Sequence, residues 1–404
     1  MSSGQNWPRQ LAYERWHAAM VETGWLTSCP TEEIDSTAAL GRVIARPVPA
    51  QRSVPHYAGS AMDGFAVRAV DTVKATTDYP VFLSLGPVGA AECRFGQAVP
   101  VDTGDALPIG ADSVIMIEQS TVTANLLEIR SAVQPGQHVR QIGEDIEIGA
   151  IVLSAGKIVG PAELAAAMAA GADRVTVAAR PRITVIPTGD EIVDSATELP
   201  AGRIRDSNSY MLAALLEGWG AQVRRHPVVP DDVFRLRQAV GSAVAASDLV
   251  VLNAGTSGGS GDFTRTALDS LGKVVCHGVA IRPGRPVLLA LVDGKPVIGL
   301  PGYPVSCLLT ASLFLKELLH EYQGRPLPKR QFVRARLASS VYSPTGSEEY
   351  LRIVLEDGDP LPAARILAKG ASLISTLVQA HGWLRVAAEC DELDAGTVVE
   401  VELF

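Results

Sequence analysis

The sequence has few cysteines, and their spacing forms neither a disulfide framework nor a zinc site. The five cysteines are scattered along 404 residues without a C-x-x-C pair, which fits reduced thiols in a cytosolic protein. The seven histidines also lack metal-ligand spacing. The sequence therefore predicts neither an oxidised secreted domain nor a zinc protein.

A surplus of basic residues and long apolar runs are also absent. The net charge of −9 argues against a general nucleic-acid binder, because neutralising phosphates requires an excess of Lys and Arg. No uncharged apolar run reaches the roughly 20 residues that span a bilayer. The first residues, MSSGQNWPRQLAYERW, carry charges where a signal peptide has its apolar core. We expect a cytoplasmic protein that binds neither nucleic acid nor membrane.

The composition is that of a globular protein with several domains. Hydrophobic residues make up 47% and charged residues 20% of the chain, and 404 residues are too many for one ordinary core. We expect an N-terminal helical or elongated module made of two segments, an inserted β domain, a three-layer α/β domain and a C-terminal β-barrel. Their expected bounds are, respectively, 1–49 with 137–180, 50–136, 181–325 and 326–404.

Periodicity suggests the elements of the first half. Apolar residues at helical spacing predict a helix over 8–22, and a shorter helical stretch covers 37–44. The short β-rich runs VFLSL, SVIMIEQ and LLEIRSAV, separated by turn residues, predict the inserted β domain. Pro161 suits the first turn of an Ala-rich helix that ends at Gly171.

The second half alternates between strands and helices. Strands at ITVIP, QVRRHPVV and DLVVLN alternate with helices at SYMLAALLEGWG, DDVFRLRQAVGSAVAA and FTRTALDSLG, and three further strands precede a helix over 305–322. Such alternation predicts a three-layer α/β domain with a mostly parallel sheet. The segment after the linker GRPLPKR has no long helical pattern, which indicates the β-barrel.

Ligands of an open α/β sheet bind beyond the carboxyl ends of its strands, and the first unusual loop there is Thr188-Gly189-Asp190-Glu191. The glycine lets the backbone approach a ligand, and the two carboxylates can hold a divalent cation. The alternative is an ordinary strand-to-helix turn capped by an aspartate.

The second loop is rich in glycine. AGTSGGSGDF, with Gly255, Ser257, Gly258, Gly259 and Asp262, exposes many backbone N–H groups before a helix, which is the arrangement of a phosphate cradle. It is no Walker A loop, because Gly-Lys-Ser/Thr is missing. A flexible linker is the alternative, but it has little reason to join a buried strand to an amphipathic helix.

The third loop, GLPGYPVS, precedes a helix and places the Ser306 hydroxyl in its first turn. Just upstream, IRPGRP puts Arg282 and Arg285 three residues apart on a rigid turn. Arginine donates hydrogen bonds in a planar fork that suits oxyanions. Either stretch alone is equally well a tight surface turn, whereas both in one α/β domain favour an anion site.

The expected β domain contributes two polar loops. Asp63 precedes a glycine and an apolar run in SAMDGFAV, and Thr103 lies in the loop Asp102-Thr103-Gly104-Asp105. Each alone is more typical of a surface turn than of a site.

Taken in order, the motifs resemble those of the MoeA family, whose eukaryotic relatives include the E domains of gephyrin and its plant counterpart. The similarity covers essentially the whole chain, and the combination is far more specific than any single motif. The motifs that carry it are SAMDGFAV, GEDI, PTGDEIV, DSN, AGTSGGSGDF, IRPGRP and GLPGYPVS.

The resemblance implies a multidomain fold, α/β plus β, with a MogA-like α/β domain. It also implies a homodimer whose active site lies between the α/β domain of one subunit and the β domain of the other. The implied activity is insertion of molybdate or tungstate into adenylated molybdopterin, in a Mg²⁺-dependent step that releases AMP. Further implied partners are an adenylyltransferase and the apo-molybdoenzyme that receives the cofactor.

Carried over position by position, the resemblance implies a role for each motif residue. The catalytic residues are Asp63, Thr103, Glu191 and Asp262. The metal ligands are Asp190, Glu191 and Asp262. The residues that bind the adenylated pterin are Thr188, Gly189, Asp190, Asp206, Asn208, Gly255, Ser257, Gly258, Gly259, Pro301 and Gly302. The residues that bind molybdate are Arg282, Arg285, Ser306, Arg352 and Ser372.

The chain departs from the commonest bacterial form of the family at four positions. Arg282 and Arg285 stand in place of lysines, Gly278 stands in place of a further lysine, and Tyr303 replaces an asparagine. Positive charge is therefore kept at two positions and lost at one.

Two other functions are compatible with parts of the sequence. A molybdopterin adenylyltransferase would need only the α/β domain, so the additional β domains and SAMDGFAV weigh against it. A non-catalytic scaffold or cofactor carrier has no need for the carboxylates of Asp63, Asp190, Glu191 and Asp262 together.

Overall fold

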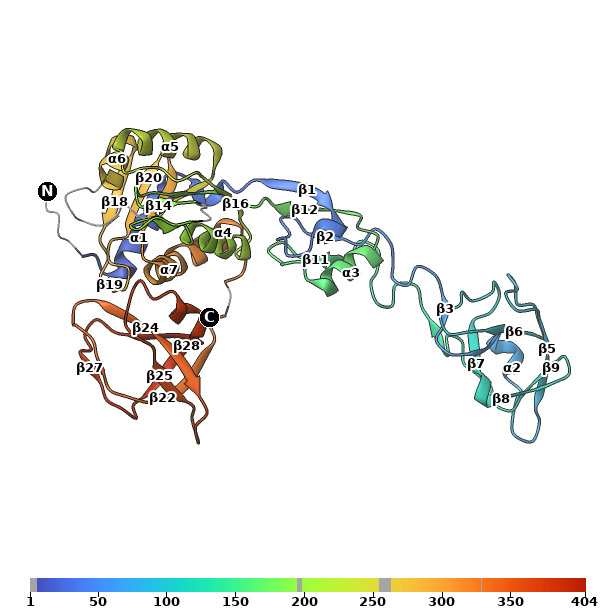
Figure 1. Cartoon of the computed structure of the whole chain (residues 1–404). Helices are drawn as coiled ribbons and strands as arrows, with labels where there is room; N and C mark the ends of the chain where they lie inside the picture. Colours follow the sequence, from blue (N-terminus) through green and yellow to red (C-terminus); the bar gives the residue numbers. More distant parts are fainter. Residues whose placement is uncertain (1–5, 195–197, 254–262, 328) are drawn as a thin grey trace. The chain divides into compact units, whose positions relative to one another are not determined.

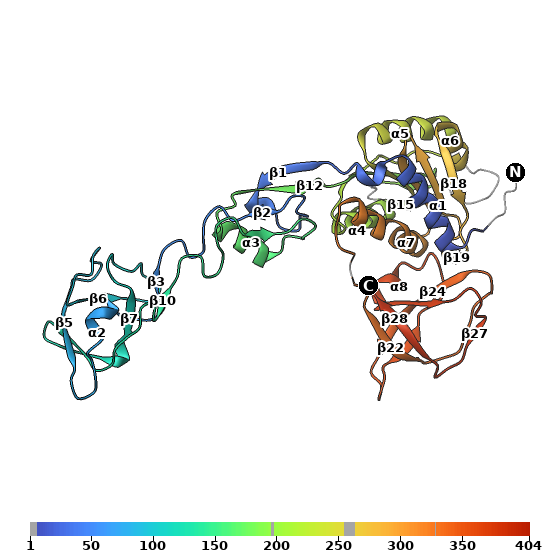
Figure 2. The same cartoon turned by 180° about the vertical axis from the view of Figure 1, so that it is seen from behind.

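The computed structural model describes residues 6–194, 198–253, 263–327 and 329–404. The chain forms two compact units. Glu33–Val177 forms the smaller unit, and the rest of the described chain forms the larger one (Figures 1 and 2).

A six-stranded sheet forms the centre of the larger unit. Its order is β16-β13-β17-β21-β20-β18. The pairs from β16 to β21 are parallel, and β20 and β18 are antiparallel to their neighbours, so the predicted, mostly parallel sheet is confirmed. The bounds are β13 Arg182–Pro187, β16 Gln222–Arg225, β17 Leu249–Asn253, β18 Lys273–His277, β20 Leu288–Val292 and β21 Lys295–Leu300.

Helices cover both faces of this sheet (Figure 1). One buried cluster joins α1, α4 and α7 to the sheet, and a second joins α5 and α6 to its other face. This arrangement confirms the three layers predicted from the alternation. The helices are α1 Arg9–Glu22, α4 Asn208–Gly218, α5 Val233–Ala246, α6 Phe263–Leu271 and α7 Pro304–Tyr322.

The first helix belongs to the larger unit, whereas the sequence analysis grouped residues 1–49 with 137–180. Trp16 is fully buried, and its indole Nε1 donates to the carbonyl oxygen of Ala290 in β20 at 2.9 Å. Ala12, Ala19 and Met20 pack into the same core. The apolar stripe that predicted the helix could not reveal which sheet it covers.

The C-terminal region is a closed five-stranded barrel, as predicted. The strands pair in the order β24-β25-β22-β28-β26, and β26 pairs again with β24. A core of alternate strand residues, including Leu351, Ile353 and Val401, fills the interior. The bounds are β22 Phe332–Leu337, β24 Glu348–Glu356, β25 Ala363–Ile366, β26 Gly382–Val386 and β28 Val398–Leu403, with the pair β23 Val341–Tyr342 and β27 Glu392–Leu393 and the helix α8 Ser375–Gln379 beside them.

The smaller unit contains the predicted β domain. Its sheet has the order β7-β4-β6-β5-β9-β8. Gly64 in β4 is required by packing, because a Cβ there would clash with the carbonyl oxygen of Ile115 in β7. The bounds are β4 Gly64–Val67, β5 Val81–Leu85, β6 Gln97–Val101, β7 Ser113–Met116, β8 Ser120–Thr123 and β9 Leu126–Ile129, with a short helix α2 Ala69–Thr72.

The remainder of the smaller unit is built from short strand pairs and one helix. β1 pairs with β12, β2 with β11 and β3 with β10. The predicted helix over 37–44 is wrong: only a 3₁₀ turn, Ser36–Ala38, is helical there. The bounds are β1 Thr31–Asp35, β2 Val48–Pro49, β3 Gly59–Ser60, β10 Val139–Arg140, β11 Ile151–Leu153, β12 Arg174–Ala178 and α3 Pro161–Ala169.

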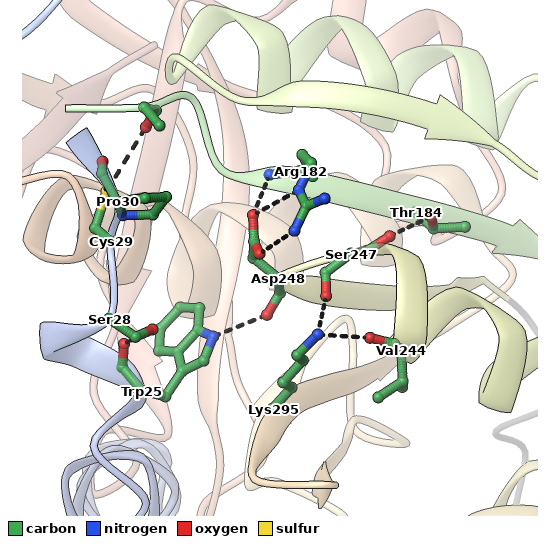
Figure 3. A network of polar contacts seen from close by, with 11 residues as sticks. Trp25, Ser28, Cys29, Pro30, Arg182, Thr184, Val244, Ser247, Asp248 and Lys295 are labelled. Carbon is green, nitrogen blue, oxygen red and sulfur yellow. Dashed lines mark hydrogen bonds and ion pairs between the residues drawn. The ribbon is translucent and has the colours of Figure 1, made fainter. Parts of the chain in front are cut away.

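A polar network fixes the amino ends of β13 and β17 (Figure 3). Asp248 accepts a hydrogen bond of 3.1 Å from the Arg182 guanidinium through its carboxylate, and its carbonyl oxygen accepts one of 2.8 Å from the Trp25 indole. Lys295 Nζ donates to the carbonyl oxygens of Val244 at 2.7 Å and Ser247 at 2.8 Å. These bonds tie η1 (Trp25–Thr27) and the end of α5 to the sheet at the edge opposite the strands' carboxyl ends.

We expect Lys295→Met to lower the free energy of unfolding by about 1–3 kcal/mol, because two buried carbonyl oxygens at the end of α5 lose their donor. Tryptophan fluorescence during urea denaturation measures this, since all five tryptophans lie in the larger unit. Lys273→Met, at an exposed position, is the control. Equal unfolding midpoints for the two variants would contradict the assigned role.

Candidate functional site

The carboxyl ends of the parallel strands meet at one edge of the sheet, as their common direction requires. The loop after β13 and the loop between β21 and α7 both leave from this edge. The glycine-rich residues Gly255, Ser257, Gly258, Gly259 and Asp262, between β17 and α6, lie outside the described residues. The site is therefore built from the remaining loops.

An acidic cluster lies at the end of β13. The Asp231 amide donates to Asp190 Oδ1 at 3.2 Å. Burial, followed by the charges of Asp190 and Glu191, raises the pKa of Asp231. Three carboxylates thus repel one another here, which is the electrostatic setting that a cation relieves. Among the described residues, however, no group of three Asp, Glu, His or Cys side chains is arranged to hold a metal ion as it stands.

Asp231 is a residue that the sequence analysis missed. It belongs to an Asp-Asp pair before α5, and Asp232 caps that helix by accepting from the Arg235 amide at 2.8 Å. The pair thus has the appearance of a helix cap. That Asp231 also lies beside Asp190 is visible only in the structure, where a bridge between Thr188 and Val229 brings the two loops together.

Thr188 and Gly189 shape the start of the acidic loop. The Thr188 amide donates to the carbonyl oxygen of Asn253 at 2.9 Å, and the side chain is buried. Gly189 has a φ of 136°, and a Cβ there would lie 2.9 Å from Glu191 Oε2. Glycine is therefore needed for the turn that brings both carboxylates to the sheet edge.

The PGYPVS loop is held from three sides. Asn253 Nδ2 donates to the carbonyl oxygen of Pro301 at 3.1 Å, and Asn208 Nδ2 donates to that of Gly302 at 2.7 Å. The Val305 amide donates to the carbonyl oxygen of Ala371, which belongs to the C-terminal region, at 3.1 Å. Asn253 was also missed by the sequence analysis, because a single asparagine at a strand end carries no motif.

Asp206 caps the following helix. Its carboxylate accepts from the amide of Ser209 at 3.0 Å and from the Ser209 hydroxyl, and it lies 4.0 Å from the Arg225 guanidinium. Arg225 in turn lies over the ring of Tyr210, 3.5 Å from its centroid. Asp206 is 5% exposed, so in this structure its carboxylate stabilises the first turn of α4.

The two arginines of the RPGRP turn are exposed, and the glycine between them packs on α7. Arg285 Nε donates to Asn6 Oδ1 at 2.9 Å. Gly284, with a φ of 118°, packs so closely on α7 that a Cβ would lie 2.5 Å from Thr310 Cγ2. Thr310 is one helical turn after Ser306 and donates to its carbonyl oxygen at 2.7 Å. The RPGRP turn thus lies against the amino-terminal part of α7. An anion site formed by the turn and Ser306 would require this proximity.

Arg352 is tied to the segment that precedes α8. The side chain is 3% exposed, and it donates through Nη2 to the carbonyl oxygens of Gly370 at 3.3 Å and of Ala368. Its Nε is buried without a partner among the described residues, and burial lowers its pKa. Ser372 in this segment is exposed. Since the carbonyl oxygen of Ala371 holds the Val305 amide, the segment joins Arg352 to the residue before Ser306.

In the smaller unit the structure brings Asp63 and Thr103 together. Asp63 Oδ1 accepts from both the amide and the hydroxyl of Thr103, each at 2.7 Å. These two bonds lower the pKa of Asp63, so the carboxylate stays charged at neutral pH. Tyr57 steadies the same loop by donating from its hydroxyl to the carbonyl oxygen of Gly104 at 2.9 Å.

A cavity of about 410 Å³ lies between α7, α4 and the barrel. It is lined mainly by apolar side chains, such as Trp219, Leu309 and Trp383. None of the predicted site residues lines it, so the polar strand-end loops and not this cavity form the candidate site. Among the described helices, none is long and apolar enough to cross a membrane.

Three stretches match known families and together cover most of the chain. Residues 10–171 match the MoeA N-terminal region (domain I and II), residues 184–321 match the probable molybdopterin binding domain, and residues 334–404 match the MoeA C-terminal region (domain IV).

Individual proteins are similar along nearly their whole length. Molybdopterin molybdenumtransferase 2 of Mycobacterium tuberculosis is 34% identical over 391 residues, which are 93% of this chain and 96% of the relative. A putative molybdopterin biosynthesis protein of Methanocaldococcus jannaschii is 30% identical over 381 residues, 92% of each. A crystal structure of the molybdopterin biosynthesis MoeA protein of Pyrococcus horikoshii superposes with a TM-score of 0.85 at 32% identity and covers 99% of both chains.

Proposed function

Because this chain belongs to the MoeA family, we propose that it inserts molybdate or tungstate into adenylated molybdopterin and releases AMP. The relatives' names support molybdenum cofactor biosynthesis. The observation that most supports the chemistry is that acidic side chains and a hydrogen-bonded, proline-fixed loop leave the same edge of the α/β sheet.

We propose that the acidic cluster contributes to a magnesium site, since carboxylate oxygens are ligands that Mg²⁺ prefers. Asp190 and Glu191 would hold the ion, with Asp262 from the glycine-rich loop and with Asp231 as an additional carboxylate. Mg²⁺ prefers such oxygen ligands and, when bound, offsets the charge of a pyrophosphate. Burial and then the charges of Asp190 and Glu191 raise the pKa of Asp231, and without a cation these carboxylates would also repel the adenylated substrate. The chain's own contribution is to keep these groups close through the bond between Asp231 and Asp190.

We propose that the oxyanion binds where the RPGRP turn approaches α7. Arg282 and Arg285 supply positive charge, and the Ser306 hydroxyl supplies a neutral donor. Arg352 and Ser372 complete the proposed set from the C-terminal region. Arg352 already donates to two carbonyl oxygens. We therefore propose that it mainly positions the 368–372 segment and supplies positive charge near the oxyanion, rather than donating to the oxyanion directly.

Arg285→Ala is expected to raise the molybdate concentration needed for half-maximal AMP release by about 10-fold or more. This factor equals about 1.4 kcal/mol and reflects the loss of one charge-assisted contact. Arg285→Lys should fall between, since the charge remains and the fork is lost. The measurement is AMP release as a function of molybdate concentration. Arg334→Ala, exposed on the barrel, is the control. If Arg285→Ala abolished pterin binding and left the molybdate response unchanged, this arginine would serve the pyrophosphate.

We further propose a cytoplasmic homodimer in which Asp63 and Thr103 of one subunit serve the active site of the other. The adenylated pterin would be bound by Thr188, Gly189, Asn208, Pro301 and Gly302. Its phosphate cradle would be formed by Gly255, Ser257, Gly258 and Gly259. The buried Asp206 supports this set by capping α4. An adenylyltransferase would supply the substrate and an apo-molybdoenzyme would take the product.

One experiment tests the function against its nearest rival. The rival is adenylation of molybdopterin, which would need only the α/β domain, the region that matches the probable molybdopterin binding domain. The protein is incubated in one reaction with adenylated molybdopterin, magnesium and molybdate, and in another with ATP, magnesium and molybdopterin. AMP release and metal-loaded pterin in the first reaction support the proposal. Adenylated pterin formed only in the second would overturn it.

A further inference from the structure

The backbone amides of Gly302 and Tyr303, in the PGYPVS loop, have no acceptor among the residues that the structure describes. Gly302 and Tyr303 are exposed, in contrast to the buried Pro301 before them. Neither of their N–H groups donates to another of the described residues. An exposed amide is normally solvated, so this alone does not indicate a ligand. What distinguishes these amides is how their peptide groups are held.

Both peptide groups are fixed through their carbonyl oxygens by buried asparagines. Asn253, 4% exposed, donates to the carbonyl oxygen of Pro301 at 3.1 Å, and Asn208, 9% exposed, donates to that of Gly302 at 2.7 Å. Neither peptide bond is among the cis bonds of the chain, and in a trans peptide the C=O and N–H point in opposite directions. Holding the carbonyls inward therefore turns the N–H groups of Gly302 and Tyr303 outward.

The asparagines are themselves fixed. Asn253 ends the central strand β17, lies between Pro187 and Leu300 in the sheet, and also donates to Cys307 Sγ at 3.3 Å. Asn208 begins α4, and its second amide atom, Oδ1, is buried without a partner among the described residues. This orphaned acceptor beside the loop suits a ligand that carries a hydroxyl or ring N–H next to its oxyanion.

We infer that Asn208 and Asn253 are positioning residues that aim the Tyr303 and Gly302 amides at a phosphate oxygen of a nucleotide-like ligand. The inference deepens the proposed function, since it places the phosphate of the adenylated substrate on this loop. Two pre-oriented N–H groups bind an oxyanion without the cost of ordering the loop, and the adjacent amino end of α7 adds its favourable dipole.

The test follows the Tyr303 amide directly. Protein labelled with ¹⁵N-tyrosine has eight tyrosine amides, and the Tyr303→Phe variant identifies the one of interest. Titration with AMP should shift the Tyr303 resonance. Asn208→Ala should reduce that shift and raise the dissociation constant of AMP about 10-fold, because the amide is no longer held outward. Asn208→Asp, whose side chain has the same shape but no N–H donor, should reduce the shift and raise the dissociation constant at least as much.

Gln323→Ala is the matched control, because Gln323 is another buried amide that donates to backbone carbonyl oxygens, at the far end of α7. If the effect were purely structural, Asn208→Ala and Gln323→Ala would raise the dissociation constant of AMP to a similar extent. The inference is overturned if saturating AMP leaves the Tyr303 resonance in place, or if Gln323→Ala weakens AMP binding as much as Asn208→Ala does. Failure of the proposed function has a different signature, since AMP would still shift Tyr303 while adenylated molybdopterin released no AMP.

Discussion

Glu191→Gln is expected to slow AMP release from adenylated molybdopterin by about 100-fold or more, the size commonly seen when a transition-state contact through a bound ion is lost. The substitution keeps the shape of the side chain and removes one charge. If a cation bridges Glu191 and the pyrophosphate, that charge is needed to hold the ion. The measurement is the rate of AMP release at several Mg²⁺ concentrations.

The same substitution separates a cation site from simple repulsion. Without a bridging cation, a neutral amide in place of the Glu191 carboxylate would remove one of the negative charges beside Asp231 and would strengthen binding of the anionic substrate. If a cation does bridge Glu191 and the pyrophosphate, Glu191→Gln needs a higher Mg²⁺ concentration for its remaining activity. Glu217→Gln, an exposed change on α4, should behave as the native protein does. An unchanged rate that no longer depends on Mg²⁺ would contradict the assignment.

The elements were predictable wherever local periodicity and burial agree. β13 and β17 are mostly apolar because helices cover both sheet faces, and their sequences ITVIP and DLVVLN show it. The helix over 8–22 was equally clear from Trp16 and Met20. The stretch 37–44 has a few apolar residues at helical spacing but forms no helix, because some of its backbone amides donate to another segment, as from Gly41 to Val159.

From the sequence, candidate-site residues could be proposed only where they belong to a recognisable motif, and not where a residue outside the motifs joins them through the fold. Asp63 and Thr103 lie 40 residues apart in two motifs that the resemblance assigns to one site, and in the structure they share two hydrogen bonds. Asn253 and Asp231 lie in no motif that suggests a ligand. Their positions arise from strand order, which brings the carboxyl ends of β16, β13, β17 and β21 to one edge of the sheet. The spacing of residues along the sequence does not reveal which strand ends lie close together in space.

Asp63→Ala is expected to reduce activity as severely as Glu191→Gln, although the two residues belong to different compact units of the chain. The variant leaves the amide and hydroxyl of Thr103 without their common acceptor and removes a carboxylate whose lowered pKa keeps it charged. Asp78→Ala, an exposed change in the same β domain, is the control for folding of that domain. Native-like activity of Asp63→Ala would remove this residue from the site.

Mixing the two inactive variants tests whether one active site draws on two subunits. In a mixed dimer, the intact α/β domain of an Asp63→Ala chain would meet the intact β domain of a Glu191→Gln chain, while the other site would carry both changes. With free exchange, half of the dimers are mixed and each has one good site, so about a quarter of the native activity should return in a two-fold dimer. If each chain completed its own site, every site would carry one inactivating change. An inactive mixture, with subunit exchange verified by mass spectrometry, would then show that Asp63 and Glu191 serve one site within a single chain.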